Sequence, residues 1–131
     1  MKIEVFTLCE AAEDQDGRLS LFGTYERISV PHLPFQLAVG TIALRLRFTF
    51  METGIHSLCL RCVGPDGDSV MEPVGCSFDI TSFPDTDSAA CNLILPLPIL
   101  TLQEAGEHSF DFYRENDLLA QLPLLVAGPA P

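Results

Sequence analysis

The stretch TIALRLRFTF, residues 41–50, decides the fold class. Every second residue in it is large and apolar: Ile42, Leu44, Leu46, Phe48 and Phe50. The residues between them are small or polar and include Arg45 and Arg47. Because successive side chains of a strand point to opposite faces, this pattern predicts a half-buried antiparallel strand with one face on the core.

The same alternation recurs on both sides of this stretch in short runs separated by turn residues. We expect strands at residues 2–10, 19–30, 41–50, 55–63, 69–80, 91–102, 108–114 and 120–126. Short, regularly spaced strands without a helical stripe are typical of an all-β protein. The sequence therefore predicts a single antiparallel β-sandwich of about eight strands over residues 1–126, of immunoglobulin-like or jelly-roll type. We expect residues 127–131 to form a flexible tail.

Two prolines set one of these strands apart. Pro96 and Pro98 are two residues apart in CNLILPLPIL, residues 91–100. Residues i and i+2 of a strand direct their N–H groups to the same side, and proline has none. We therefore expect this stretch to be a sheet edge or to leave the sheet.

The last predicted strand is apolar on both faces. Leu118, Leu122 and Leu124 alternate on one face, and Leu119 and Leu125 lie on the other. A sandwich strand normally has one solvated face. The pattern leaves two alternatives open, namely burial on both sides or a homo-oligomer through this C-terminal strand.

Charge and composition exclude several classes of function. The chain has 131 residues, with 18 acidic and 7 basic residues and a net charge of −11. Binding to nucleic acid or to an anionic membrane depends on Lys and Arg, so we expect neither partner. Neither a signal peptide nor a run of ~18 apolar residues is present. We therefore expect a cytoplasmic protein whose five cysteines are free thiols.

The phrase Gly-x-His-Ser occurs twice, in TGIHSLCL (53–60) and AGEHSFDF (105–112). His56 and His108 each begin the apolar face of a strand that follows a glycine turn. We interpret both rings as rim side chains, with one nitrogen in water. The functional alternative is a metal pair or a catalytic base, which requires the two rings to meet in a cleft. His32 has no partner in the sequence.

Cys59 and Cys62 have the spacing of half a zinc site. They lie within a predicted strand, where residues i and i+3 point to opposite faces. We therefore interpret them as buried apolar residues.

Three acidic loops offer a calcium site as an alternative. If every strand reverses direction, the first and third loops lie at the same end of the sandwich. The weak metal candidates are therefore Asp14, Asp16, Asp85 and Asp87. The ordinary interpretation is that Asp and Gly are common turn residues.

Three arginines are candidate partner-binding residues: Arg45, Arg47 and Arg61. If residues 51–54 form a hairpin, Arg61 falls opposite Arg45, and like charges in that position destabilise a sheet. We expect an acidic side chain to answer them, with Glu4, Glu72 and Asp79 as possibilities. A surface ion-pair network is the favoured interpretation, and docking of an acidic partner is the alternative.

Several short patterns resemble a family of short uncharacterised bacterial proteins. The residues that carry the resemblance are Leu8–Ala11, Asp16-Gly17, Phe22-Gly23, Ala43–Phe48 and Gly106–Val126. The resemblance covers nearly the whole chain and implies an all-β sandwich with no assigned activity. It transfers no catalytic or binding residue.

Together these observations favour a non-enzymatic interaction or structural module, with no cofactor and an unidentified protein partner. No nucleophile-elbow, phosphate-loop or HExxH pattern indicates an enzyme, and we identify no catalytic residue. A small-ligand or calcium-binding sandwich is the first alternative. An enzyme with a spatially assembled histidine site is the second.

Overall fold

The computed structural model describes residues 1–38, 40–81 and 87–129, and this part of the chain is nearly all β. Its strands are β1 (Lys2–Gln15), β2 (Arg18–Tyr25), β3 (Arg27–Ser29), β4 (Phe35–Leu37), β5 (Thr41–Thr49), β6 (Gly54–Val63), β7 (Val74–Ile80), β8 (Ser88–Pro96), β9 (Leu100–Leu102), β10 (Gly106–Arg114) and β11 (Asp117–Ala127). The one helical segment of the described residues is the 3-10 turn η1 (Phe50–Glu52). The all-β prediction is confirmed. The two sandwich types remain predictions.

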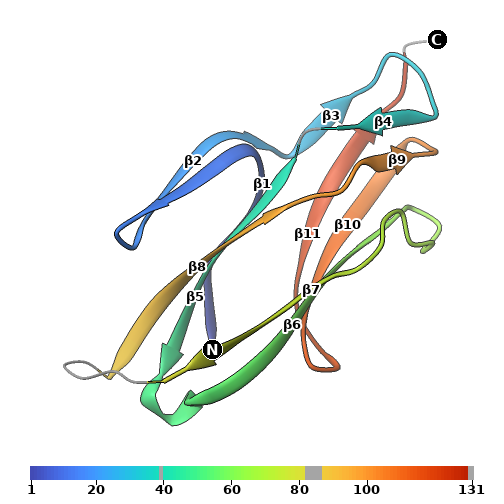
Figure 1. The fold of residues 1–131 in the computed structure, drawn as a ribbon. Helices are drawn as coiled ribbons and strands as arrows, with labels where there is room; N and C mark the ends of the chain where they lie inside the picture. The colour runs from blue at the N-terminus through green and yellow to red at the C-terminus, as the bar shows by residue number, and fades with distance from the viewer. Residues whose placement is uncertain (39, 82–86, 130–131) are drawn as a thin grey trace.

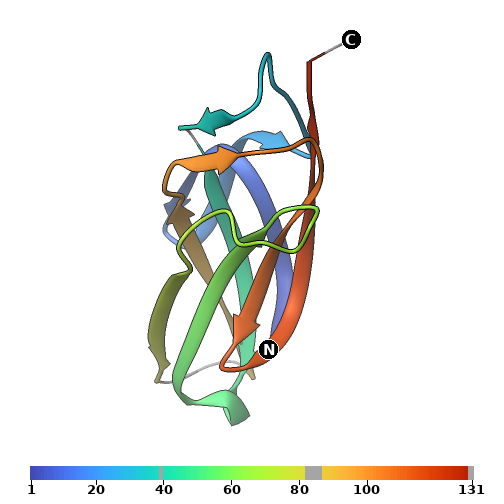
Figure 2. The ribbon, with the colours of Figure 1, turned by 90° about the vertical axis from the view of Figure 1, so that its right-hand side faces the viewer.

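The strands form two large sheets and one small one (Figures 1 and 2). The first sheet has the order β2-β1-β5-β8, and the second has the order β3-β11-β10-β6-β7. The small sheet pairs β4 with β9 at one end of the molecule (Figure 1). The described strands pair antiparallel, except that β3 lies parallel to β11. The chain thus crosses from the first sheet to the second between β2 and β3.

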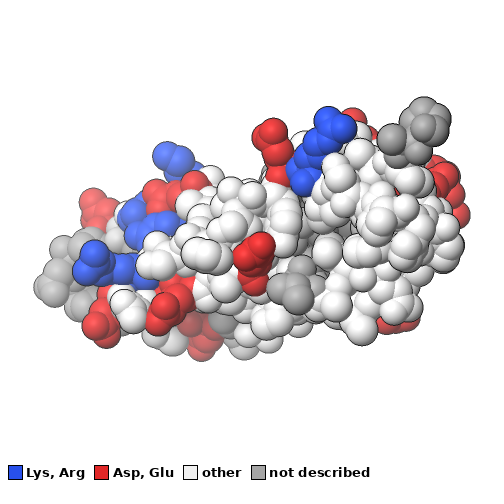
Figure 3. Space-filling view, turned by 90° about the horizontal axis from the view of Figure 1, so that it is seen from above, with Lys and Arg blue, Asp and Glu red and all other residues white. Residues whose placement is uncertain are grey.

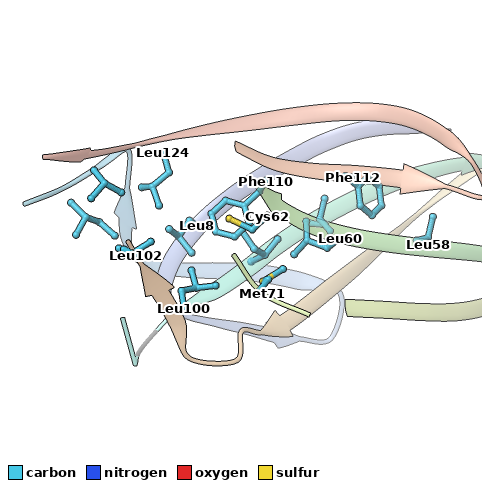
Figure 4. Close-up of a cluster of buried hydrophobic side chains, with 14 of the residues drawn as sticks. Leu8, Leu58, Leu60, Cys62, Met71, Leu100, Leu102, Phe110, Phe112 and Leu124 are labelled. Carbon is cyan, nitrogen blue, oxygen red and sulfur yellow. The ribbon is translucent and has the colours of Figure 1, made fainter. Parts of the chain in front are cut away.

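The alternation in β5 builds one wall of the core. Ile42, Leu44, Leu46 and Phe48 are all completely buried. They belong to one cluster with side chains of the second sheet, among them Leu60, Cys62, Phe110 and Phe112 (Figure 4). The two large sheets therefore pack face to face, and burial of these apolar faces is the main force that holds them together.

The described residues contain eleven strands, so the expected count of eight is wrong. The predicted strand at 19–30 divides at Glu26, where the chain changes sheets, into β2 and β3. The predicted strand at 91–102 divides into β8 and β9, and β4 lies between the predicted strands at 19–30 and 41–50. A period-2 pattern does not show where a predicted strand divides into short strands of different sheets.

The prediction for the proline pair is confirmed in both of its forms. β8 is an edge strand of the first sheet. It ends at Pro96, and the chain then joins the small sheet through β9. The missing N–H groups prevent normal pairing on that side of the strand.

A β-bulge changes the faces of β11. Phe112 pairs with Ala120, whereas the next residue, Tyr113, pairs with Leu118, so Leu119 is the extra residue. Paired residues share a face, so Leu118 joins Tyr113 on the outer side and is 47% exposed. The prediction that Leu118 shares a face with Leu124 is therefore wrong.

The tip of the β1–β2 hairpin lies against β5 and β8, the other two strands of the first sheet. Its turn is Asp16-Gly17 alone, with φ angles of 53° and 81°, so residues 11–15, which lie beyond the predicted strand at 2–10, belong to β1. The carbonyl oxygen of Gly17 accepts hydrogen bonds from Arg45 Nη1 and Asn92 Nδ2, each at 3.2 Å. These bonds anchor the tip of the hairpin on β5 and β8.

Two further expectations concern membrane spans and the tail. Within residues 1–38, 40–81 and 87–129, no helix is long and apolar enough to cross a membrane. β11 continues to Ala127, the first residue of the expected tail. The end of that tail, residues 130–131, lies outside the described residues.

Candidate interaction site

The turn after β5 exposes large apolar side chains at one end of the molecule. β5 ends at Thr49, and the chain enters η1 (bottom of Figure 1), so Phe50 leaves the core face. Phe50 is 57% exposed, Met51 is 81% exposed and Ile55, at the start of β6, is 74% exposed. The expectation that Phe50 shares the buried face of Phe48 is therefore wrong. Three such side chains within six residues form a local apolar projection.

Glu52 fixes the shape of this turn. Its Oε1 atom accepts hydrogen bonds from the backbone N–H of Thr49 at 3.1 Å and from Thr49 Oγ1 at 3.3 Å. Its Oε2 atom accepts from Arg114 Nη1 at 3.3 Å and forms an ion pair with the N-terminal ammonium of Met1. One carboxylate thus ties η1 to β5, β10 and the N-terminal residue.

The pKa of Glu52 reflects these contacts. Partial burial of the carboxyl alone would raise its pKa. The hydrogen bond and charge of the N-terminal ammonium, with the hydrogen bonds of Thr49, outweigh burial and lower the pKa to about 2. Glu52 is therefore ionised at neutral pH, where it holds the turn as a carboxylate.

His56 closes the turn from the side of the core. Its half-buried ring lies against Phe48, with ring centroids 5.1 Å apart. Its Nε2–H donates to the carbonyl oxygen of Glu52 at 2.6 Å, and the N–H of Phe50 donates to the carbonyl oxygen of Asp87 at 3.1 Å. The projecting apolar side chains therefore stand on a turn that is bonded on several sides.

The two repeated histidines lie at opposite ends of the second sheet. Val63 of β6 pairs with Ser109, the residue after His108, and His56 precedes Val63 by seven positions. At ~3.3 Å per residue, the two rings are separated by ~23 Å. They do not meet in a cleft, so the hypothesis of a joint metal or catalytic site is wrong. The rim interpretation also fails for His108, which is 1% exposed.

Arg45 and Arg47 bind an acidic side chain of their own sheet, as expected. A β-bulge lies between Ile3 and Val5, so Glu4 is the extra residue of β1 opposite β5. Glu4 accepts from Arg45 Nε at 3.1 Å and from Arg47 Nε at 2.9 Å. These bonds to Arg47 and Arg45 lower the pKa of Glu4. Other donors of both arginines bond to Asn92, Ser88 and Gly17. The docking role of these two residues remains a prediction.

Arg61 does not face Arg45, because β5 and β6 belong to different sheets. The chain between them is a crossover and not a hairpin, and the expected pairing is wrong. Arg61 pairs in register with Asp111, and its guanidinium carbon lies 5.0 Å from the centre of the Tyr113 ring. This cation–π contact is exposed and does not test whether Arg61 binds a partner, so that role remains a prediction.

The acidic loops have structural roles in the described residues. Asp14 Oδ1 accepts from the N–H of Gly17 at 2.9 Å, and Asp16 occupies the first left-handed position of the turn. Asp87 uses its carbonyl oxygen to bind η1. Asp85 lies outside the described residues. Among the residues described, no three His, Cys, Asp or Glu side chains are grouped to hold a metal ion.

The five cysteines are free thiols. Cys62 packs in the core beside Phe110, whereas Cys59 pairs with Tyr113 on the other face of β6. Burial, with a smaller contribution from the charge of Asp111, raises the pKa of the Cys62 thiol to about 12. Cys62 is therefore a protonated core residue at neutral pH.

Sequence reasoning missed the apolar turn because Phe50 continues the alternation of β5 without a break. A signal for the turn is nevertheless present. Thr49 and Glu52 have the Thr-x-x-Glu spacing of a capping box, which indicates a helical turn at Phe50.

The fold and this site define a short, nearly all-β protein that presents a fixed apolar turn. The chain belongs to a family of unknown function, DUF6941, whose model matches residues 4–127. The resemblance to an uncharacterised family is thus confirmed. No curated protein matches the chain.

Among solved structures, a distant similarity is found to the crystal structure of a glycosyl hydrolase family 2 (GH2) member from Bacteroides cellulosilyticus DSM 14838, at a TM-score of 0.36 and 9% identity. The match covers 75% of this chain and 13% of that chain. At this TM-score the similarity supports no argument about function.

Proposed function

We propose that this protein is a non-enzymatic interaction module that docks on a protein partner through the η1 turn. The observation that carries the proposal is the exposure of Phe50, Met51 and Ile55 on a turn fixed by Glu52. Large apolar anchors contribute most of the binding energy at protein interfaces. Because the backbone of this turn is already ordered, little conformational entropy is lost on docking.

Charges near the turn indicate the chemistry of the partner. Exposed carboxylates lie close to it, since Asp79 pairs in register with Ile55, Asp87 bonds to Phe50 and Glu115 bonds to Ser57. A complementary surface has an apolar cleft rimmed by Lys or Arg. With a net charge of −11, the protein itself is repelled by anionic membranes.

Site-specific photo-crosslinking in the native cell tests this proposal. A photoreactive residue replaces Met51 in one variant and, in the matched control, exposed Gln36 of β4 at the opposite end of the molecule (Figure 1). We expect a distinct crosslinked protein from position 51 that is absent from position 36. The same bands from both positions, or none from position 51, would show that η1 is not a docking site.

A homo-oligomer is the second candidate, and two leucines of β11 favour it. Leu118 and Leu125 are 47% and 41% exposed on the outer side of the second sheet. Sedimentation of the wild type and of the L118S/L125S variant separates this candidate from the first. A dimer lost in the variant supports it, and a wild-type monomer at high micromolar concentration eliminates it.

A further inference from the structure

A hollow lies at the opposite end of the second sheet from η1. It is formed where the loop after β6 meets the segment that joins β9 to β10, and its volume is 340 Å³. Its lining includes His108, three carboxylate residues and the hydroxyl residues Ser69 and Thr101. None of the lining residues is Lys or Arg. Seen from above, the described atoms at the right-hand end of the molecule in Figure 3 are red and white, and the blue atoms of Lys and Arg lie toward the left-hand end and near the middle.

His108 gives this hollow an unusual polar atom. The residue lies beside Leu124 at the margin of the core and is 1% exposed. Its Nδ1–H donates to the carbonyl oxygen of Gly106 at 3.2 Å, so Nε2 carries the lone pair of the neutral ring. No residue in the described part of the chain pairs with Nε2. Buried polar groups are nearly always bonded, so this acceptor is suited to a donor from a molecule bound in the hollow.

The carboxylates of the hollow favour a positively charged ligand. Asp66, Asp68 and Glu104 all belong to its lining. The backbone N–H of Asp68 donates to Asp66 Oδ1 at 3.1 Å. This hydrogen bond is the largest cause of the lowered pKa of Asp66. Asp66 is therefore ionised at neutral pH, and no Lys or Arg of the lining balances its charge.

We propose that the hollow binds a small organic ammonium compound, which donates an N–H to His108 Nε2 while Asp66 and Glu104 balance its charge. A metal ion fits less well, because no three suitable side chains among the described residues are grouped to coordinate one. An ammonium compound tolerates dispersed carboxylates, and its short hydrocarbon part suits the apolar lining residues Pro65 and Val70. The site is independent of the η1 turn, so each proposal can fail alone.

Titrations followed by two-dimensional NMR test this site with defined probes. The probes are 1,4-diaminobutane, the uncharged 1,4-butanediol of similar length, and calcium chloride. We expect saturable shifts from the diamine, largest at residues 64–70 and 101–108, and none from the diol. Equal shifts from diol and diamine, shifts spread over all acidic loops, or a response to calcium alone would overturn the proposal.

Variants connect the binding to the named side chains. H108F removes the acceptor without changing the charge or much of the ring volume, and we expect at least a tenfold loss of diamine affinity. The fold should survive, because Phe fills nearly the same space and the variant loses a single hydrogen bond, from Nδ1 to the carbonyl oxygen of Gly106. D66N should also weaken binding, whereas D14N in the β1–β2 hairpin should not. Unchanged affinity in H108F and D66N, or equal losses in D66N and D14N, would show that the diamine does not bind at this hollow.

Discussion

Gly106 lies close to Pro65, where the two loops of the hollow meet. Its φ angle is +132°, and a Cβ atom added there would lie 2.8 Å from Pro65 Cγ. An L-residue is strained at this angle, and the contact forces the loops apart. We predict that G106A lowers the free energy of unfolding by about 3 kcal/mol, measured by urea denaturation.

Gly67 provides a matched control in the same pair of loops. Its φ angle is +88°, but a Cβ atom added there would have no other atom within 4 Å, so G67A adds backbone strain alone. We expect it to cost about 1 kcal/mol. If G106A cost no more than G67A, the close contact with Pro65 would have no energetic effect.

The lowered pKa of Glu52 predicts how the free energy of unfolding depends on pH. Its pKa is about 2 in the folded chain, below the reference value of 4.5. A lowered folded pKa stabilises the protein above the unfolded pKa, and this contribution is lost as pH falls from about 4.5 toward 2. We predict that wild type is more stable than E52Q at pH 6 and that the difference disappears near pH 2. Urea denaturation at several pH values measures it.

A constant difference between wild type and E52Q from pH 6 to pH 2 would contradict this assignment. D16N is a suitable control, because the side chain of Asp16 is exposed at a distant turn. Its stability profile should run parallel to that of the wild type.

At the scale of the element, the sequence pattern and the structure differ at the end of β5. Phe48 is completely buried, whereas Phe50, two residues later, is 57% exposed in η1. We predict that F48A lowers the free energy of unfolding by about 3–5 kcal/mol, because it leaves a large cavity. F50A should change it by less than about 1 kcal/mol. Comparable losses in the two variants would mean that Phe50 packs in the core.

The strands show which structural features a period-2 pattern can predict and which it cannot. The alternation of β5 and the two prolines of β8 correctly indicate a core strand and an edge, because each signal is local. The bulge at Leu119 reverses the face of Leu118, and no local pattern predicts it, since a bulge depends on pairing with β10. The partner of Arg61 is also not predictable, because hairpin and crossover connections of this length look alike in sequence.

The candidate sites are harder to predict than the strands. Glu4 can be named from the sequence as a partner for Arg45 and Arg47, because neighbouring positive charges require a carboxylate. His108 stands out in the sequence, but its burial and its unpaired Nε2 depend on loops that lie far from it along the chain. For Met51, the spacing of Thr49 and Glu52 indicates the turn, but the exposure of the side chain on that turn is a property of the tertiary fold.

The free edges of the first sheet are both irregular. β2 and β8 lie at its two margins. Gly23 interrupts β2 with a left-handed φ of 66°, and Pro96 lacks an N–H at the end of β8. Such interruptions oppose edge-to-edge pairing with another chain. For this reason we place the proposed docking site on the η1 turn rather than on a strand edge.

At the scale of the whole molecule, the chain consists of a packed centre and an exposed arm. β5 lies between β1 and β8, and four of its side chains are in the common core. The distal part of the β1–β2 hairpin, residues 11–24, is largely exposed, with Phe22 at 70%. The arm is tied to the sheet chiefly by bonds at Gly17, so its opening requires little loss of apolar burial.

This division predicts two levels of hydrogen exchange. Amides of β5 should exchange only through global unfolding, whereas amides of residues 11–24 should exchange through a smaller, local opening. Mass spectrometry of exchange in wild type and F48A measures both. The F48A substitution should accelerate exchange in β5 and leave the arm unchanged, because the arm opens while the core remains folded. If F48A accelerated both segments equally, the arm and the centre would form one cooperative unit.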